Sequence, residues 1–330
     1  MPNFQVTSDG VIEENRLKGL VPAVDGKKLR QIRLQGFDDP DTHLHPEIFA
    51  LELWKRIVEV YSRTAITKSE DKLVALSGMA GWMARRIGTP AQPATYVAGL
   101  WTLHLASQLL WRVEPTFRAI DGQFEHLTVA PDKYRAPSFS WASLDAHEGN
   151  GIVYGDITDR DLFIDIEEAQ IRPESFANVY GTVVSGHVIL RGKLRKVKLS
   201  MEDKGRFCWQ FVDREMLNEE KHTNMYLDCY SRDKECIFGP DADVFVLPAA
   251  KGERTASPES KYFVCLLLQL KRDWTESGPV FRRIGLTKLS PWADNRAMQE
   301  DKVLEAFPSD VDMPHQGYDP ETGTHRIVLV

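Results

Sequence analysis

The hydrophobic pattern of this chain changes its period at Pro115. Before that residue, apolar side chains recur every three or four positions, which is typical of amphipathic helices. After it they alternate, which is typical of strands, and turns rather than helices of crossover length separate most strand-like segments. The change of period predicts an α+β chain in which a small helical layer packs on a large antiparallel β-barrel or β-sandwich.

Three parts of the chain follow from this pattern. Residues 1–46 carry turn signals, so we expect an N-terminal arm with one short strand at 29–34. Residues 47–115 form the helical layer: one helix begins near Pro46, a second follows the capping-box pair Thr67 and Glu70, and a third is buried at 96–113. Residues 116–330 form an antiparallel β-rich domain, with strands expected at 139–143, 151–154, 161–170, 177–185, 188–199, 206–212, 224–230, 243–247, 262–271, 280–289 and 325–330.

Charge and composition exclude several classes of protein. The 330 residues carry a net charge of -7, which argues against a nucleic-acid partner. No segment has the roughly 20 apolar residues of a membrane span, and the first residues do not form a signal peptide, so we expect a cytoplasmic protein. Cys208, Cys229, Cys236 and Cys265 show no CxxC spacing and are expected to be buried reduced thiols.

No motif for a cofactor is present in the sequence. GxGxxG, Walker A, GxSxG and HExxH patterns are all missing, so we expect neither a nucleotide cofactor nor an acyl-enzyme. The stretch DDPDTHLHPE (38–47) contains enough His, Asp and Glu side chains for a metal site. Acidic residues before a helix also favour its N-terminus, and no second ligand group is apparent, so we expect no metal.

Aromatic and histidine residues are the candidate site residues. Alternation across APSFSWASLD (136–145) places Phe139, Trp141 and Ser143 on one face of an expected strand. Trp101 and His104 fall on one side of the third expected helix, whereas His187, Tyr226 and Tyr230 fall on strands. Each could instead belong to an ordinary core, because buried aromatic and histidine side chains are common there.

Five blocks, in order, resemble one known family. They are Trp54 with Tyr61-Ser62, DKLVALSGMA (71–80), YVAGLW (96–101), LLW (109–111) and APSFSWASLD (136–145). This order is similar to the region after the N-terminal core of fungal heterokaryon-incompatibility (HET) proteins, and FRRIGL (281–286) is similar to a late strand of that family. Two departures stand out: Ser138-Phe139 replaces a serine-tryptophan pair, and the ALSYxWG-type signalling portion has no counterpart here.

The resemblance implies two classes of function. The first is a stand-alone HET-like pericyclase that needs no cofactor and cyclises a small apolar terpenoid or polyketide intermediate of fungal secondary metabolism. Trp101, Trp141 and Phe139 would then shape the substrate in an enclosed apolar cavity, and His104 or Ser143 would donate a hydrogen bond to it. His187, Tyr226 and Tyr230 would be further wall residues. The second class is a non-catalytic, truncated HET relative that binds a protein partner in allorecognition; a homodimer is compatible with either class.

Overall fold

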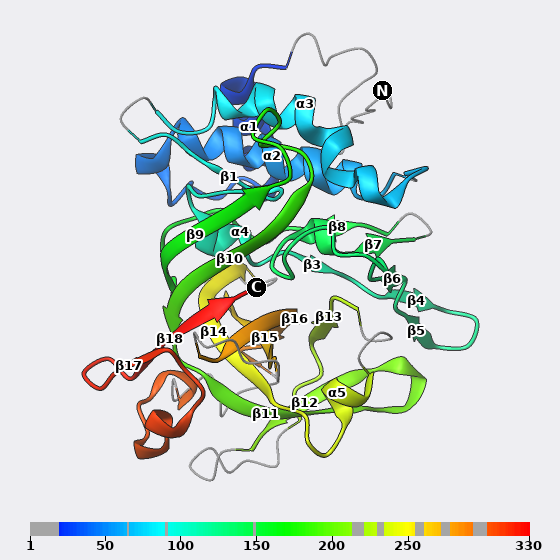
Figure 1. The fold of residues 1–330 in the computed structure, drawn as a ribbon, viewed down its shortest axis with the longest axis vertical. Coiled ribbons are helices and arrows are strands. Elements are labelled where there is room, and N and C mark those ends of the chain that lie inside the picture. Colours follow the sequence, from blue (N-terminus) through cyan, green and yellow to red (C-terminus); the bar gives the residue numbers. More distant parts are fainter. Residues whose placement is uncertain are drawn as a thin grey trace.

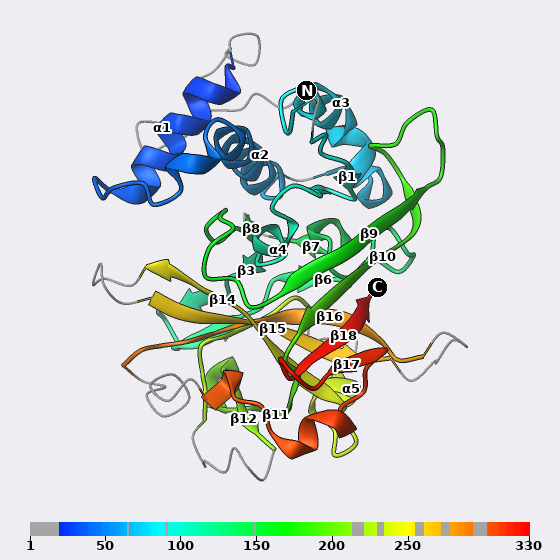
Figure 2. The same ribbon diagram turned by 90° about the vertical axis from the view of Figure 1, so that its left-hand side faces the viewer.

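The computed structural model describes residues 20–64, 66–89, 92–147, 150–212, 221–229, 234–254, 261–271, 278–292 and 302–330. Its architecture is mixed α+β, as the change of period predicts. Three helices lie at one end of the molecule, a ten-stranded sheet lies at the other, and two-stranded sheets of short strands lie between them (Figures 1 and 2). The long strands β9 and β10 extend from the sheet toward the helices (Figure 2).

The helical layer consists of α1 (Pro22–Leu34), α2 (Glu47–Tyr61) and α3 (Lys72–Ala84). Helix α2 confirms the helix expected to begin near Pro46, and its apolar stripe is buried. The strand expected at 29–34 is wrong, because those residues belong to α1, which packs on α2. The buried face of α1 includes the charged Arg30, which an apolar period does not reveal. The expected capping box is also wrong: α3 follows Asp71, and no side chain caps it.

The third expected helix is largely wrong. Residues 96–113 form the hairpin of β1 (Tyr96–Val97) and β2 (Leu100–Trp101), the single turn α4 (Leu105–Gln108) and β3 (Arg112–Val113). Ala98 and Gly99 at the hairpin turn have φ values of 48° and 97°, a left-handed geometry that favours glycine and ends any helix. The apolar run reflects complete burial of short elements rather than one helix face.

The ten-stranded sheet confirms the β-rich part of the chain. Its order is β12-β11-β14-β15-β16-β18-β10-β9, with β13 paired to β16 and β17 paired to β18. Every pairing is antiparallel except the short parallel contact of β16 with β18, and among the described residues no pairing joins the two ends of this order. The strands are β9 (Asp165–Pro173), β10 (Val183–Gly192), β11 (Arg195–Met201), β12 (Phe207–Phe211), β13 (Met225–Leu227), β14 (Val244–Arg254), β15 (Lys261–Leu270), β16 (Val280–Leu289), β17 (Gly317–Asp319) and β18 (Thr324–Leu329).

Small two-stranded sheets lie between the helices and the ten-stranded sheet. The strand β3 pairs with β8 (Ile152–Val153), β4 (Thr116–Arg118) with β5 (Gln123–Glu125), and β6 (Thr128–Val129) with β7 (Asp145–Ala146). The strand expected at 139–143 is wrong, because Trp141–Ser143 form a 3₁₀ turn. The side chain of Ser140 accepts a hydrogen bond from the backbone N–H of Ala142 at 3.0 Å, which stabilises the turn in place of a strand ladder.

Strand β15 is covered on both faces, as its uninterrupted apolar sequence predicts. Val264, Leu266 and Leu268 pack into the large core that also holds the helices. The alternate residues Phe263, Cys265 and Leu267 pack into a second core with β12 and the short helix α5 (Lys234–Phe238). No helix in the described ranges is long and apolar enough to cross a membrane.

Candidate functional site

The aromatic rings singled out from the sequence lie in a packed core. Trp101, Trp141 and Phe139 are fully buried. The ring of Trp101 lies edge-on to Trp54, with ring centres 5.6 Å apart, and Trp141 lies edge-on to Tyr61 at 6.1 Å. None of the three lines either pocket described below, so the expected empty cavity is not found at these rings.

The remaining predicted residues are dispersed. His104 precedes α4 with φ of 52°; its Nε2 is buried without a hydrogen-bond partner, and burial lowers its pKa. His187 lies on β10, partly exposed, with Nε2 3.9 Å from a carboxylate oxygen of Glu168. Tyr230 is outside the described residues. Only Ser143 and Tyr226 line a pocket, and each lines a different one.

The pocket that Ser143 lines has a volume of about 560 Å³ and lies at the junction of several segments. The loop before Trp141, the strand β10, the end of β13 and the β15–β16 hairpin all contribute to it. We call it the Asp228 pocket and define it by Tyr134, Ser143, Ser185, Asp228, Lys271 and Arg282. Its lining combines apolar side chains, such as Leu144, Val280 and Ile284, with polar and charged ones.

Arg283 forms part of this pocket and is held rigidly. Its guanidinium donates to the carbonyl oxygen of Leu109 at 3.1 Å, to that of Trp111, and to Oδ1 of Asp228 at 3.1 Å. It also lies over the Trp111 ring, with 3.4 Å from the guanidinium carbon to the ring centre. Nη1 and Nη2 of Arg283 are committed to these partners, whereas its Nε is buried without a hydrogen-bond partner. The bond from Nη2 holds Oδ1 of Asp228 in place.

Asp228 is the buried acid of the pocket. Its side chain is 9% exposed, and its backbone N–H donates to the carbonyl of Ile284 at 2.8 Å, continuing the pairing of β13 with β16. Oδ1 accepts from Arg283, whereas Oδ2 is buried with no hydrogen-bond partner. Burial raises the pKa of this carboxyl to about 6, although the nearby Arg283 and Arg282 lower it. A carboxyl with an unused oxygen and a pKa near neutrality can donate or accept a proton.

Ser143 and Arg135 form another part of the Asp228 pocket. The Ser143 hydroxyl donates to the carbonyl of Ser140 at 2.7 Å, so its oxygen retains lone pairs but its hydrogen is already used. Arg135 is buried and donates to the carbonyl of Ala142 at 2.6 Å and to Asp145 at 2.9 Å. These bonds fix the loop that carries Tyr134 and Ser138 into the lining. The expectation that Ser143 donates to a substrate is therefore weakened by the bond it makes.

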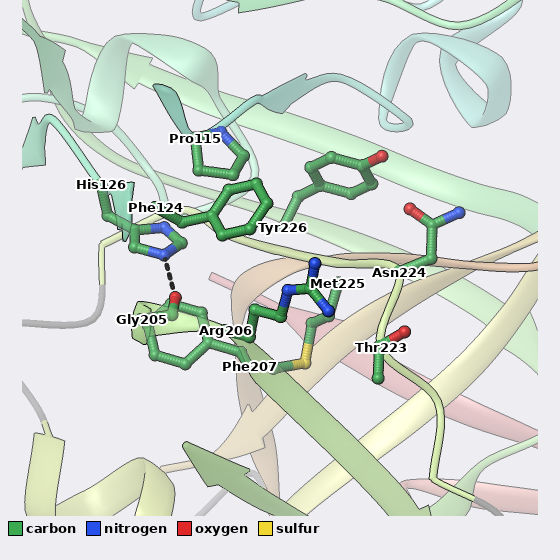
Figure 3. Close-up of a pocket in the computed structure, with 10 residues that line it drawn as sticks. All are labelled: Pro115, Phe124, His126, Gly205, Arg206, Phe207, Thr223, Asn224, Met225 and Tyr226. Atoms are coloured by element: carbon green, nitrogen blue, oxygen red, sulfur yellow. Dashed lines mark hydrogen bonds between the residues drawn. The ribbon is translucent and has the colours of Figure 1, made fainter. Parts of the chain in front are cut away.

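Tyr226 lines a second pocket, of about 330 Å³, which we call the aromatic pocket (Figure 3). Phe124, His126 and Phe207 lie on its walls, and His126 Nε2 is 2.9 Å from the carbonyl oxygen of Gly205 (Figure 3). The guanidinium of Arg206 lies 5.3 Å from the centre of the Phe124 ring. Met225 and Tyr226 line the aromatic pocket and Asp228 lines the larger one, so β13 lies between the two.

Sequence reasoning missed Asp228 and Arg283. Both were visible as charged residues within apolar strand-like segments, a pattern that predicts a buried ion pair. The acidic stretch 38–47 has another role: Asp39 and Asp41 bind Arg30, both at 2.6 Å. Across the described parts of the chain, no group of three or more His, Cys, Asp or Glu side chains is placed to hold a metal.

Comparisons with known proteins give no family for this chain. Neither a scan against models of protein families nor searches of curated proteins and solved structures found a match.

Proposed function

We propose that this chain is a cofactor-independent cyclase of the pericyclase (Diels–Alder) type, acting in the Asp228 pocket on an apolar terpenoid or polyketide intermediate of fungal secondary metabolism. One observation carries the proposal: a pocket of about 560 Å³, lined by both apolar and charged side chains, includes a buried carboxyl whose Oδ2 has no hydrogen-bond partner. Pockets of roughly 300–1,000 Å³ hold most small ligands. The HET-like blocks of the sequence support the same class.

Positioning is the main contribution that we assign to the pocket. In a Diels–Alder step two new carbon–carbon σ bonds form from three π bonds, one π bond moves, and no atom is gained or lost. Such a step requires the diene and the alkene to be held close and aligned, and holding them so can contribute on the order of 7–11 kcal/mol in favourable cases. The rigid β13–β16 pairing and the bonds of Arg135 and Arg283 supply fixed walls.

Asp228 supplies electronic activation in this proposal. The protonated carboxyl donates a hydrogen bond from Oδ2 to a carbonyl conjugated with the alkene, withdraws electron density from it, and retains its proton throughout. A preorganised donor aimed at developing charge needs no reorganisation at the moment of reaction. Arg283 holds Oδ1, and Oδ2 has no hydrogen-bond partner, so we assign the donated bond to Oδ2.

The test is incubation of the purified protein with linear or monocyclic polyene precursors that carry a conjugated carbonyl. Mass spectrometry and NMR follow the appearance of an isomer of unchanged mass. Ser185 and Val184 are neighbours on β10 and both exposed, but only Ser185 lines the pocket. Ser185→Trp should abolish the acceleration and Val184→Trp should retain it; equal rates for the two variants contradict this site.

A second candidate function is a non-catalytic HET-like protein that binds a protein partner. The solid aromatic core around Trp141 and the exposed apolar side chains of α1, Val24 and Ile32, favour it. This alternative predicts that no precursor is cyclised faster than in buffer. It also predicts stoichiometric binding of one protein that Val24→Glu/Ile32→Glu abolishes and Ser185→Trp leaves unchanged.

A further inference from the structure

The charged lining of the Asp228 pocket is mostly basic, although the whole chain carries a net charge of -7. Asp228 is its one acidic side chain in the described part of the chain, and it faces a basic set that comprises Lys133, Arg135, Lys271, Arg282 and Arg283. A cleft lined by one sign of charge concentrates ligands of the opposite sign. The lining therefore favours a substrate that carries a negative charge.

Two of these basic side chains are available for a ligand. Arg135 and Arg283 are buried and bound to carbonyl and carboxylate groups, and Arg282 donates to Gln269 at 2.5 Å. Lys133 and Lys271 are exposed, and neither makes an ion pair or side-chain hydrogen bond with any residue that the structure describes. A lysine ammonium at a pocket rim reaches an anion without breaking an existing bond.

We propose that the substrate is an apolar molecule with a carboxylate, which Lys271 and Lys133 bind while Asp228 donates to a carbonyl elsewhere on the same molecule. This rests on the proposed function, since it names the substrate class of that site. Lysine ammonium groups bind carboxylates and phosphates alike, so a phosphate is the comparison ligand in the test below. A flexible substrate that is bound both at its carboxylate and at its carbonyl has fewer conformations available between these two groups.

The experiment is isothermal titration calorimetry of the whole protein with decanoate, methyl decanoate and decyl phosphate. We expect decanoate to bind at least about threefold more tightly than its ester, with a preference that falls as salt rises. Lys271→Gln should weaken decanoate binding about threefold, and Lys133→Gln/Lys271→Gln about tenfold if the two effects add. Lys271→Arg should restore it, and Lys68→Gln, at an exposed lysine outside the pocket, should have no effect.

Several outcomes overturn the inference. Equal affinity for decanoate and its ester, absence of decanoate binding, or an unchanged affinity in Lys271→Gln would each refute it, and tighter binding of decyl phosphate would refute the choice of carboxylate. Binding that survives Ser185→Trp would place the ligand outside this pocket. Lysine-dependent binding of decanoate without cyclisation of any precursor would refute the proposed function alone, so the two failures are distinguishable.

Discussion

Trp54 and Trp141 donate their indole N–H groups to the same acceptor, the carbonyl oxygen of Gly99, at 3.1 and 3.0 Å. This shared acceptor joins helix α2, the β1–β2 turn and the 3₁₀ turn at 141–143. The geometry explains why the rings that suggested a cavity form a solid core instead.

Replacing Trp141 by phenylalanine should therefore lower the free energy of unfolding more than replacing Trp101 by phenylalanine. Both rings are fully buried, but the indole N–H of Trp101 has no partner, whereas that of Trp141 is bonded. Loss of the hydrogen bond from the Trp141 N–H costs about 1 kcal/mol. Removal of the unsatisfied Trp101 N–H instead recovers part of the cost of burying it, which is about 1–3 kcal/mol. In urea unfolding, the free energy of unfolding of Trp141→Phe should be at least about 1 kcal/mol lower than that of Trp101→Phe. The reverse order would contradict this hydrogen-bond assignment.

Alanine at Gly99 should destabilise the fold through both backbone and packing. Gly99 has φ of 97°, and an added Cβ would lie 2.6 Å from Nε1 of Trp141. We expect a loss of about 2–4 kcal/mol in the free energy of unfolding. Gly36 is the matched control, because its φ is 86° but nothing lies within 4 Å of an added Cβ, so Gly36→Ala should cost only about 1–2 kcal/mol. Equal losses would show that contact with Trp141 adds nothing.

Methionine at Arg30 should be strongly destabilising. The guanidinium is buried and lies 2.6 Å from Asp39, 2.6 Å from Asp41 and 3.4 Å from Glu52. Removing one partner of a buried ion pair costs about 3–5 kcal/mol, whereas Arg85→Met, at an exposed arginine, should change stability by less than about 0.5 kcal/mol. Urea unfolding of both variants measures the difference.

The same cluster sets an acid limit to stability. Burial alone would raise the pKa values of Asp39, Asp41 and Glu52, but the hydrogen bonds and charges of their arginine and lysine neighbours outweigh burial and lower all three. Carboxyls with lowered folded-state pKa values stabilise the fold above about pH 4, and this contribution is lost as the pH falls further. The free energy of unfolding of the wild-type protein should fall between pH 4 and pH 2. That of Arg30→Met should fall by a smaller amount over the same interval. An equal loss would contradict the pairing.

Cyclisation should depend on the protonation of Asp228. Burial raises its pKa to about 6, so the donating, protonated form decreases above that pH, and the rate of the chemical step should fall about tenfold per pH unit. Asparagine donates at every pH, so Asp228→Asn should give a flat profile, provided that circular dichroism shows a folded protein. A purely structural role for Asp228 would instead leave the pH profile of the variant like that of the wild type.

The predictable part of the fold rests on alternation. The strands expected at 206–212, 262–271 and 280–289 are found as β12, β15 and β16. The strands expected at 177–185 and 188–199 are misplaced, because their expected break falls inside β10 and the turn between β10 and β11 falls inside the second of them. The failures lie where complete burial removes the pattern, as at Trp101 and Leu109, or where a charged residue such as Arg30 occupies the buried face. The 3₁₀ turn at Trp141 depends on a hydroxyl of Ser140 bonding to the backbone, which side-chain polarity alone does not reveal.

The candidate site was less predictable than the fold. Aromatic residues identify burial, but burial does not distinguish a core from a cavity wall, and only Tyr226 and Ser143 among the predicted residues line a pocket. Asp228 acquires its properties from Arg283, 55 residues away in sequence, through a pairing that only the sheet creates.

The bonds of Arg283 connect three distant segments of the chain. Its guanidinium joins the carbonyls of Leu109 and Trp111 to the carboxylate of Asp228 and projects from the central strand β16. Arg283 and Asp228 both line the pocket, so its lining is bonded to segment 109–111, which does not itself line it. A ligand that binds only this assembled state will slow amide hydrogen exchange on both sides of the junction together.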